Sequence, residues 1–116
     1  FEETARLSLR AVAAKVNGYP AGMVSAVTAY DFTMSDKIEI VVVGSSPTRD
    51  AMLRLVYGQY LPNRIVAIST DGRSSLPLFE GRVAPAGTTL AYVCCNSTCG
   101  VPATTAEELL EQLGEV

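Results

Sequence analysis

Residues 38–44 read Ile-Glu-Ile-Val-Val-Val-Gly, a nearly unbroken run of β-branched side chains that ends at a glycine. Such continuity is typical of an interior strand of a parallel sheet, which is buried on both faces. Ser46 and Pro47 follow directly, and a serine cap before a proline at the first helical position predicts a helix to about Tyr57. A strand that leads straight into a helix predicts a βαβ unit.

The segments after this helix complete an α/β pattern. Residues 64–70 and 88–94 predict a second and a third strand, and residues 71–87, rich in Gly, Ser and Pro, predict mostly loop. Thr104 or Thr105, with Glu107 or Glu108 behind it, predicts a capping box that opens a last helix. A right-handed crossover between the first two strands favours a small three-stranded, mostly parallel sheet of order 2-1-3, with helices on both faces.

The chain changes character near Lys37. Apolar residues recur at helical spacing in residues 4–17 and again in 21–33, and residues 17–20, Asn-Gly-Tyr-Pro, separate the two runs. We therefore expect an αα-hairpin over residues 1–36 and a small α/β domain over residues 37–116, in the order αα-βαββα. The hairpin is apolar over more than one stripe, so we expect it to pack on two sides and the isolated chain to form a homo-oligomer.

Composition narrows the possible partners and cellular locations. The chain has 116 residues, 48% of them hydrophobic and 18% charged, with a net charge of -3 and its nine Lys and Arg residues scattered, so no nucleic-acid partner is expected. No apolar run approaches the roughly 20 residues that cross a bilayer, so no membrane partner is expected. Three cysteines are too few for a disulfide scaffold, and a cytoplasmic location fits best. Because Phe1-Glu2-Glu3 is neither a start methionine nor a signal-peptide head, we expect a piece of a longer protein.

All three cysteines, Cys94, Cys95 and Cys99, lie together at the end of the third predicted strand. Strand alternation puts Cys94 and Cys95 on opposite faces, so only one of them can pair with Cys99. The favoured interpretation is that Cys94 and Cys99 are small apolar fillers around a turn, and a disulfide is the alternative. No metal is expected, because the chain has no histidine and a structural zinc needs four ligands. No Lys or His stands beside the cysteines in sequence to lower a thiol pKa.

Gly44, Ser45 and Ser46 lie where the first strand gives way to a helix, a place that can bind an anion. A helix cap and tight turn is the preferred interpretation, because Pro47 removes one donor and the glycine and lysine pattern of a phosphate loop is missing. Without histidine, no Ser-His-Asp or Cys-His arrangement exists within the chain. We therefore expect no catalytic residues and no cofactor in this chain itself, with Cys94, Cys99 and Cys95 as the only redox candidates.

Several segments together resemble the C-terminal end of one family. They are residues 38–44, Tyr60-Leu61-Pro62-Asn63, Leu78-Phe79-Glu80-Gly81-Arg82 and, most specifically, Ala91-Tyr92-Val93-Cys94-Cys95-Asn96 with Cys99 and Pro102. The family is the thioredoxin-domain-containing group that includes bacterial YyaL and mammalian spermatogenesis-associated protein 20. The resemblance implies a thioredoxin-like domain and an (α/α)6 toroid upstream, the latter related to N-acylglucosamine 2-epimerases and six-hairpin glycosidases. The hairpin would then be the last of the toroid.

The resemblance also implies the partners and the function classes. The partners would be upstream domains of the same parent chain, and this chain would be a non-catalytic C-terminal structural module. One alternative is a thiol-disulfide redox partner that uses Cys94 and Cys99, which match the family pattern. Another is a part of a sugar-processing, epimerase-like toroid enzyme. Cys95 departs from the pattern at a variable position and leaves the pairing of Cys99 ambiguous.

Overall fold

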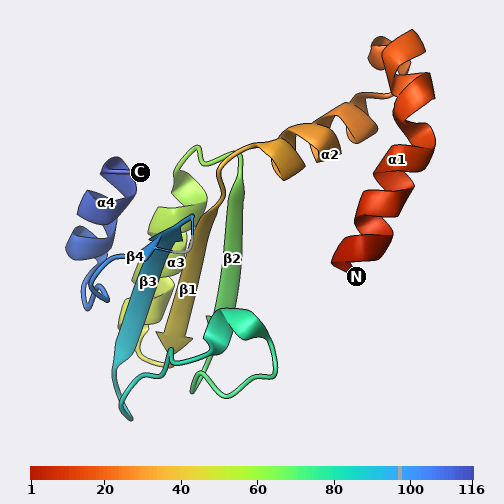
Figure 1. Cartoon of the computed structure of the whole chain (residues 1–116). Coiled ribbons are helices and arrows are strands. Elements are labelled where there is room, and N and C mark those ends of the chain that lie inside the picture. The colour runs from red at the N-terminus through yellow and green to blue at the C-terminus, as the bar shows by residue number, and fades with distance from the viewer. Residues whose placement is uncertain (97) are drawn as a thin grey trace. The chain divides into compact units, whose positions relative to one another are not determined.

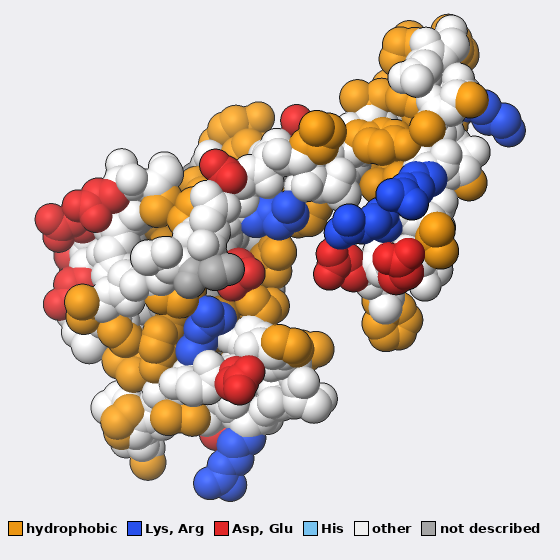
Figure 2. Space-filling view, in the orientation of Figure 1, with side chains coloured by type: hydrophobic (Ala, Val, Ile, Leu, Met, Phe, Trp, Pro, Cys, Tyr) orange, Lys and Arg blue, Asp and Glu red, His pale blue; other side chains and the backbone are white. Residues whose placement is uncertain are grey.

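The computed structural model describes residues 1–96 and 98–116, which form two compact units, Phe1–Asp36 and Lys37–Val116. The first unit consists of α1 (Glu2–Gly18), a short 3-10 helix η1 (Pro20–Gly22) and α2 (Val24–Met34), so both expected helices are present. The hydroxyl of Tyr30 donates a hydrogen bond to the carbonyl of Leu9 and links α2 to α1. No residue of either helix is buried, and Figure 2 shows hydrophobic side chains spread over the surface of both.

The second unit is built on a mixed sheet (Figure 1). Its elements are, in chain order, β1 (Ile38–Gly44), α3 (Pro47–Gly58), β2 (Arg64–Ser69), the 3-10 helix η2 (Pro77–Phe79), β3 (Thr89–Cys95), β4 (Thr98–Cys99) and α4 (Ala106–Gly114). The described strands lie in the order β2-β1-β3-β4, which confirms the order predicted for the first three. The unit is therefore α/β, as expected.

The prediction of a mostly parallel, three-stranded sheet is wrong in two respects. β1 pairs with β2 in parallel, but β3 is antiparallel to β1, and the short β4 adds a further antiparallel strand beside β3. A parallel β3 would need a crossover to the opposite end of the sheet, usually made by a helix. The chain between β2 and β3 contains only η2, and Thr89 at the start of β3 pairs with Gly44 at the end of β1, so this connection stays at one end.

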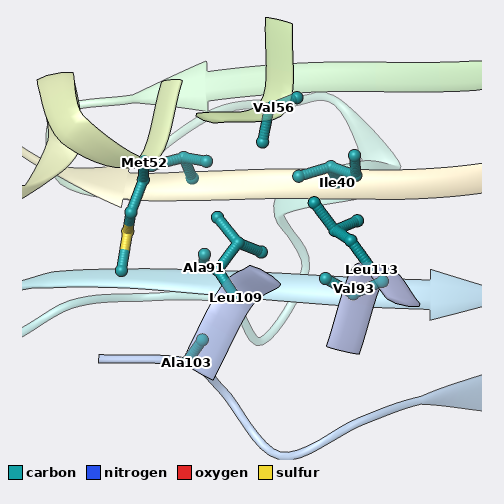
Figure 3. Packing of buried hydrophobic residues seen from close by; sticks show 9 residues of the cluster. Ile40, Met52, Val56, Ala91, Val93, Ala103, Leu109 and Leu113 are labelled. Carbon is teal, nitrogen blue, oxygen red and sulfur yellow. The ribbon is translucent and has the colours of Figure 1, made fainter. Parts of the chain in front are cut away.

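The prediction of helices on both faces of the sheet is also wrong. Both α3 and α4 cover the same face, where they pack on alternate residues of β1 and β3 (Figure 3). The buried residues of this core are Ile40, Val42, Met52, Val56, Ala91, Val93, Ala103, Leu109 and Leu113. The opposite face carries a smaller core, in which Val41 and Val43 contact Phe79 of η2. A loop segment that contains η2 therefore takes the place of the second helical layer.

A capping box begins α4, as the sequence predicts. The hydroxyl oxygen of Thr105 accepts a hydrogen bond from the backbone N–H of Glu108 at 3.2 Å. The Glu108 carboxylate in turn accepts from the Thr104 N–H at 2.7 Å, the Thr104 hydroxyl at 2.9 Å and the Thr105 N–H at 3.3 Å. These bonds, the Thr104 N–H first, hold the pKa of Glu108 below its ordinary value of 4.5. Thr105 and Glu108 therefore form the capping box that their spacing predicts.

The cap predicts a pH dependence of stability. Because the pKa of Glu108 is lowered in the folded protein, its ionised form stabilises the fold fully above pH 4.5, the unfolded value, and this contribution is lost as the pH falls through the folded value. The free energy of unfolding of the wild-type chain should therefore exceed that of Glu108→Gln at pH 7, and the difference should shrink toward pH 3. Urea titrations at several pH values measure it, with Glu107→Gln on the same helical turn as the control. A difference that is equal at pH 7 and pH 3 contradicts the prediction.

Candidate functional site

A disulfide joins Cys94 and Cys99 across the last two strands of the sheet. The two residues lie directly opposite one another in the antiparallel pairing of β3 with β4, and their sulfur atoms are bonded at 2.06 Å. Their Cα atoms are 3.9 Å apart, slightly closer than the usual lower limit of about 4.4 Å. Asn96 enters the turn between the strands with φ 50°, a left-handed conformation that asparagine tolerates. The favoured interpretation of Cys94 and Cys99 as reduced fillers is therefore wrong, and the alternative pairing is present.

The third cysteine takes no part in the disulfide. Cys95 is a free, half-buried thiol, one position along β3 from Cys94. Successive residues of a strand point to opposite faces of the sheet. The alternation therefore separates Cys95 from the Cys94–Cys99 pair, as the sequence predicts.

The two bonded sulfur residues differ in their accessibility. Cys94 is 1% exposed, on the sheet face that carries Phe79, whereas Cys99 is exposed on the short edge strand β4. An incoming thiolate must approach one sulfur along the S–S axis, so access decides which sulfur it attacks. Of the two bonded cysteines, Cys99 is the one exposed to solvent, and we take it as the more accessible to an incoming thiolate.

Arg82 lies against both sulfur atoms. Its Nη2 is 3.1 Å from Sγ of Cys94 and 3.3 Å from Sγ of Cys99. The Arg82 backbone N–H donates to the Phe79 carbonyl at 3.0 Å, and its Nη1 donates to the carbonyl of Leu78. The η2 turn therefore positions the guanidinium over the disulfide, with the Arg82 side chain only 16% exposed.

Sequence reasoning missed Arg82 as a member of the site. No Lys or His stands beside the cysteines in sequence, and Arg82 precedes Cys94 by 12 residues and Cys99 by 17. The available signal was the segment Leu78–Arg82, which the family resemblance included but to which it assigned no role. A cation beside a thiol is the feature that raises thiolate character.

Glu39 completes the charged surroundings of the disulfide. It faces Cys94 directly in the β1–β3 register, which puts both side chains on one face of the sheet. Its Oε2 is 3.8 Å from Nη2 of Arg82, the same nitrogen that contacts both sulfurs. The Glu39 side chain is 35% exposed. Among the described residues, the site therefore combines one disulfide, one cation and one carboxylate.

Two of the three candidate anion-binding residues, Gly44 and Ser46, have hydrogen-bond partners within the fold. The Ser46 hydroxyl shares a 2.7 Å hydrogen bond with the Thr89 hydroxyl and makes no side-chain cap to α3, although Ser46 occupies the cap position before Pro47. The Gly44 carbonyl accepts a 3.4 Å hydrogen bond from Nη1 of Arg49. Ser45 is exposed between them. The expectation that the Ser46 side chain caps the helix is therefore wrong, because β3 supplies a closer partner.

Several other features bear on the class of site. Within residues 1–96 and 98–116, no group of three or more His, Cys, Asp or Glu side chains is placed to hold a metal ion. In the same part of the chain, no helix combines the length and the apolar character needed to cross a membrane. Acidic side chains gather over α4 (Figure 2).

Comparison of the chain with protein-family models, with curated proteins and with solved structures finds no match. The chemistry of the site therefore rests on its own residues.

Proposed function

We propose that the Cys94–Cys99 disulfide is redox-active and that this chain is a thiol-disulfide redox partner for a protein dithiol. The observation that carries the proposal is the Arg82 guanidinium, which lies 3.1 and 3.3 Å from the two sulfurs. Both sulfurs are neutral in the disulfide and gain little from a full positive charge. A thiolate beside the same cation is strongly favoured, so Arg82 stabilises the product of reduction.

The exchange proceeds in two steps. A thiolate of the incoming dithiol attacks Sγ of the exposed Cys99, a mixed disulfide forms, and the Cys94–Cys99 bond breaks. Its electron pair leaves on Sγ of Cys94 as a thiolate beside Arg82, and exchange is faster when the departing thiolate is stabilised. The second thiol of the donor then attacks the donor sulfur that is bonded to Cys99. A disulfide forms within the donor, and Cys99 is released. In total, two electrons and two protons pass from the dithiol to the pair, and the donor becomes a disulfide.

The resemblance described above supplies the class of donor. A thioredoxin-like domain upstream in the same parent chain would carry a dithiol of the required kind, and the accessible Cys99 would be its point of attack. The alternative, a non-catalytic structural module, requires the same disulfide to stay inert in the folded protein. Nothing in the described residues favours the sugar-processing alternative.

Thiol counting by alkylation and intact mass tests the proposal. In protein purified without reductant and then unfolded, we expect one reactive thiol, Cys95, and three after reduction. In the folded protein, we expect dithiothreitol to reduce the Cys94–Cys99 bond and oxidised glutathione to restore it. Three thiols without reductant would show that the disulfide is missing in solution. A bond that yields to dithiothreitol only after unfolding would establish a structural module instead.

Two single variants form a matched pair that tests the order of attack. Cys94→Ser leaves the exposed Cys99, which should form a mixed disulfide readily with oxidised glutathione in the folded protein. Cys99→Ser leaves the buried Cys94, which should react much more slowly under the same conditions. Equal rates would contradict the assignment of Cys99 as the attacked sulfur.

A further inference from the structure

We infer that Glu39 is a positioning residue that restrains reduction of the Cys94–Cys99 disulfide, because its carboxylate competes with the departing Cys94 thiolate for Arg82. The inference rests on the proposed redox function. It assigns opposite electrostatic effects to two neighbouring side chains, Arg82 and Glu39.

The geometry of the three groups supports this competition. A single nitrogen, Nη2 of Arg82, lies 3.1 Å from Sγ of Cys94 and 3.8 Å from Oε2 of Glu39. Glu39 and Cys94 are directly paired across β1 and β3, so their side chains leave the sheet on the same face. The other terminal nitrogen, Nη1, already donates to the Leu78 carbonyl. The same nitrogen of the guanidinium therefore lies close to both the Glu39 carboxylate and the Cys94 sulfur.

The charge balance at this point changes on reduction. In the oxidised site, the positive charge of Arg82 is offset by the carboxylate of Glu39, and the sulfurs are neutral. When Cys94 leaves as a thiolate, two negative groups share one cation in a partly buried place, where Coulomb interactions are stronger than in water. Repulsion from Glu39 opposes the thiolate, and a proton taken up by Cys94 relieves it. Glu39 therefore makes the reduced state less favourable than Arg82 alone would make it.

A neutral side chain at position 39 should shift the redox equilibrium toward the dithiol. We expect Glu39→Gln to raise the equilibrium constant for reduction by glutathione about threefold to fivefold at pH 7. A change of this size corresponds to the interaction free energy of a partly exposed charge pair. In this reaction, two glutathione molecules give two electrons and two protons to the pair and become one disulfide. The probe is a series of reduced and oxidised glutathione ratios, with each mixture quenched by alkylation and read by mass.

Three further measurements separate the effect of charge from that of structure. Glu80→Gln removes an exposed carboxylate beside the same η2 turn, for which no bond to Arg82 is seen among the described residues, and should leave the constant unchanged. Salt near 1 M, where the Debye length is about 3 Å, should narrow the gap between the wild type and Glu39→Gln. Glu39→Thr, a second neutral residue and one suited to a strand, should change the constant in the same direction.

The outcomes distinguish the inference from the function beneath it. A wild-type disulfide that does not equilibrate with glutathione overturns the proposed function and the inference together. If the wild-type disulfide equilibrates and both position-39 variants have the wild-type equilibrium constant for reduction, the inference alone is overturned. A lower constant in those variants also overturns it, because that sign would mean that Glu39 assists reduction.

Discussion

Reduction of the Cys94–Cys99 disulfide should be about tenfold slower in Arg82→Gln than in the wild-type protein, and about tenfold less favourable at equilibrium. The guanidinium lies 3.1 Å from the sulfur that departs as a thiolate, so its loss removes the main stabilisation of that charge. A thiolate that is harder to form is a poorer leaving group. For a two-electron couple, a tenfold change in the constant corresponds to about 30 mV, toward more negative potential. Stopped-flow reduction by dithiothreitol and glutathione titration measure both quantities.

Matched variants show whether the effect of Arg82 is electrostatic. Arg82→Lys keeps the positive charge and should recover part of the rate, although an ammonium cannot keep every hydrogen bond of the guanidinium. Arg73→Gln removes an exposed arginine from the same connection between β2 and β3 and should change neither quantity. The free energy of unfolding is measured alongside, because Arg82 also donates to the Leu78 carbonyl. If a folded Arg82→Gln protein is reduced at the wild-type rate, the proposed role of the cation is contradicted.

Replacement of Gly44 by alanine should lower the free energy of unfolding of the Lys37–Val116 unit by about 3 kcal/mol, because backbone strain and overpacking combine. Gly44 has φ 133°, a conformation that other residues rarely adopt. A Cβ there would lie 2.3 Å from the carbonyl oxygen of Thr88 and 2.6 Å from the Cα of Thr89. These are backbone atoms at the start of β3, and Gly44 pairs with Thr89 in the sheet, so neither strand can move away alone. Urea unfolding followed by circular dichroism measures the loss.

Gly58 offers a matched control in the same unit. It ends α3, and a Cβ built there meets no atom within 4 Å. Gly58→Ala should therefore be neutral or stabilise the unit by up to about 1 kcal/mol, since it restricts the unfolded chain. A Gly44→Ala protein as stable as the Gly58→Ala protein would show that the close approach of β3 is not what requires a glycine.

Much of the local structure can be predicted from short patterns in the sequence. The β-branched run of β1, the proline that starts α3 and the Thr105–Glu108 capping box all act over one to four residues, and each is present. The separation of Cys94 from Cys95 follows in the same way, from strand alternation alone. These features depend on backbone sterics and on hydrogen bonds between near neighbours, so the sequence determines them without knowledge of the rest of the chain.

The tertiary structure decided the direction of β3, the shared face of α3 and α4, and which residues surround the Cys94–Cys99 disulfide. Each depends on where residues far apart in the chain meet. The connection before β3 returns to the same end of the sheet, which makes β3 antiparallel, and the β1–β3 register then places Glu39 opposite Cys94. The η2 turn brings Arg82 to two sulfurs that lie 12 and 17 residues further along the chain. The sequence by itself determined the four α-helices and the strands β1 to β3, and it marked the three cysteines as candidates. Only packing could decide which charges surround them, because charges act through space and not along the chain.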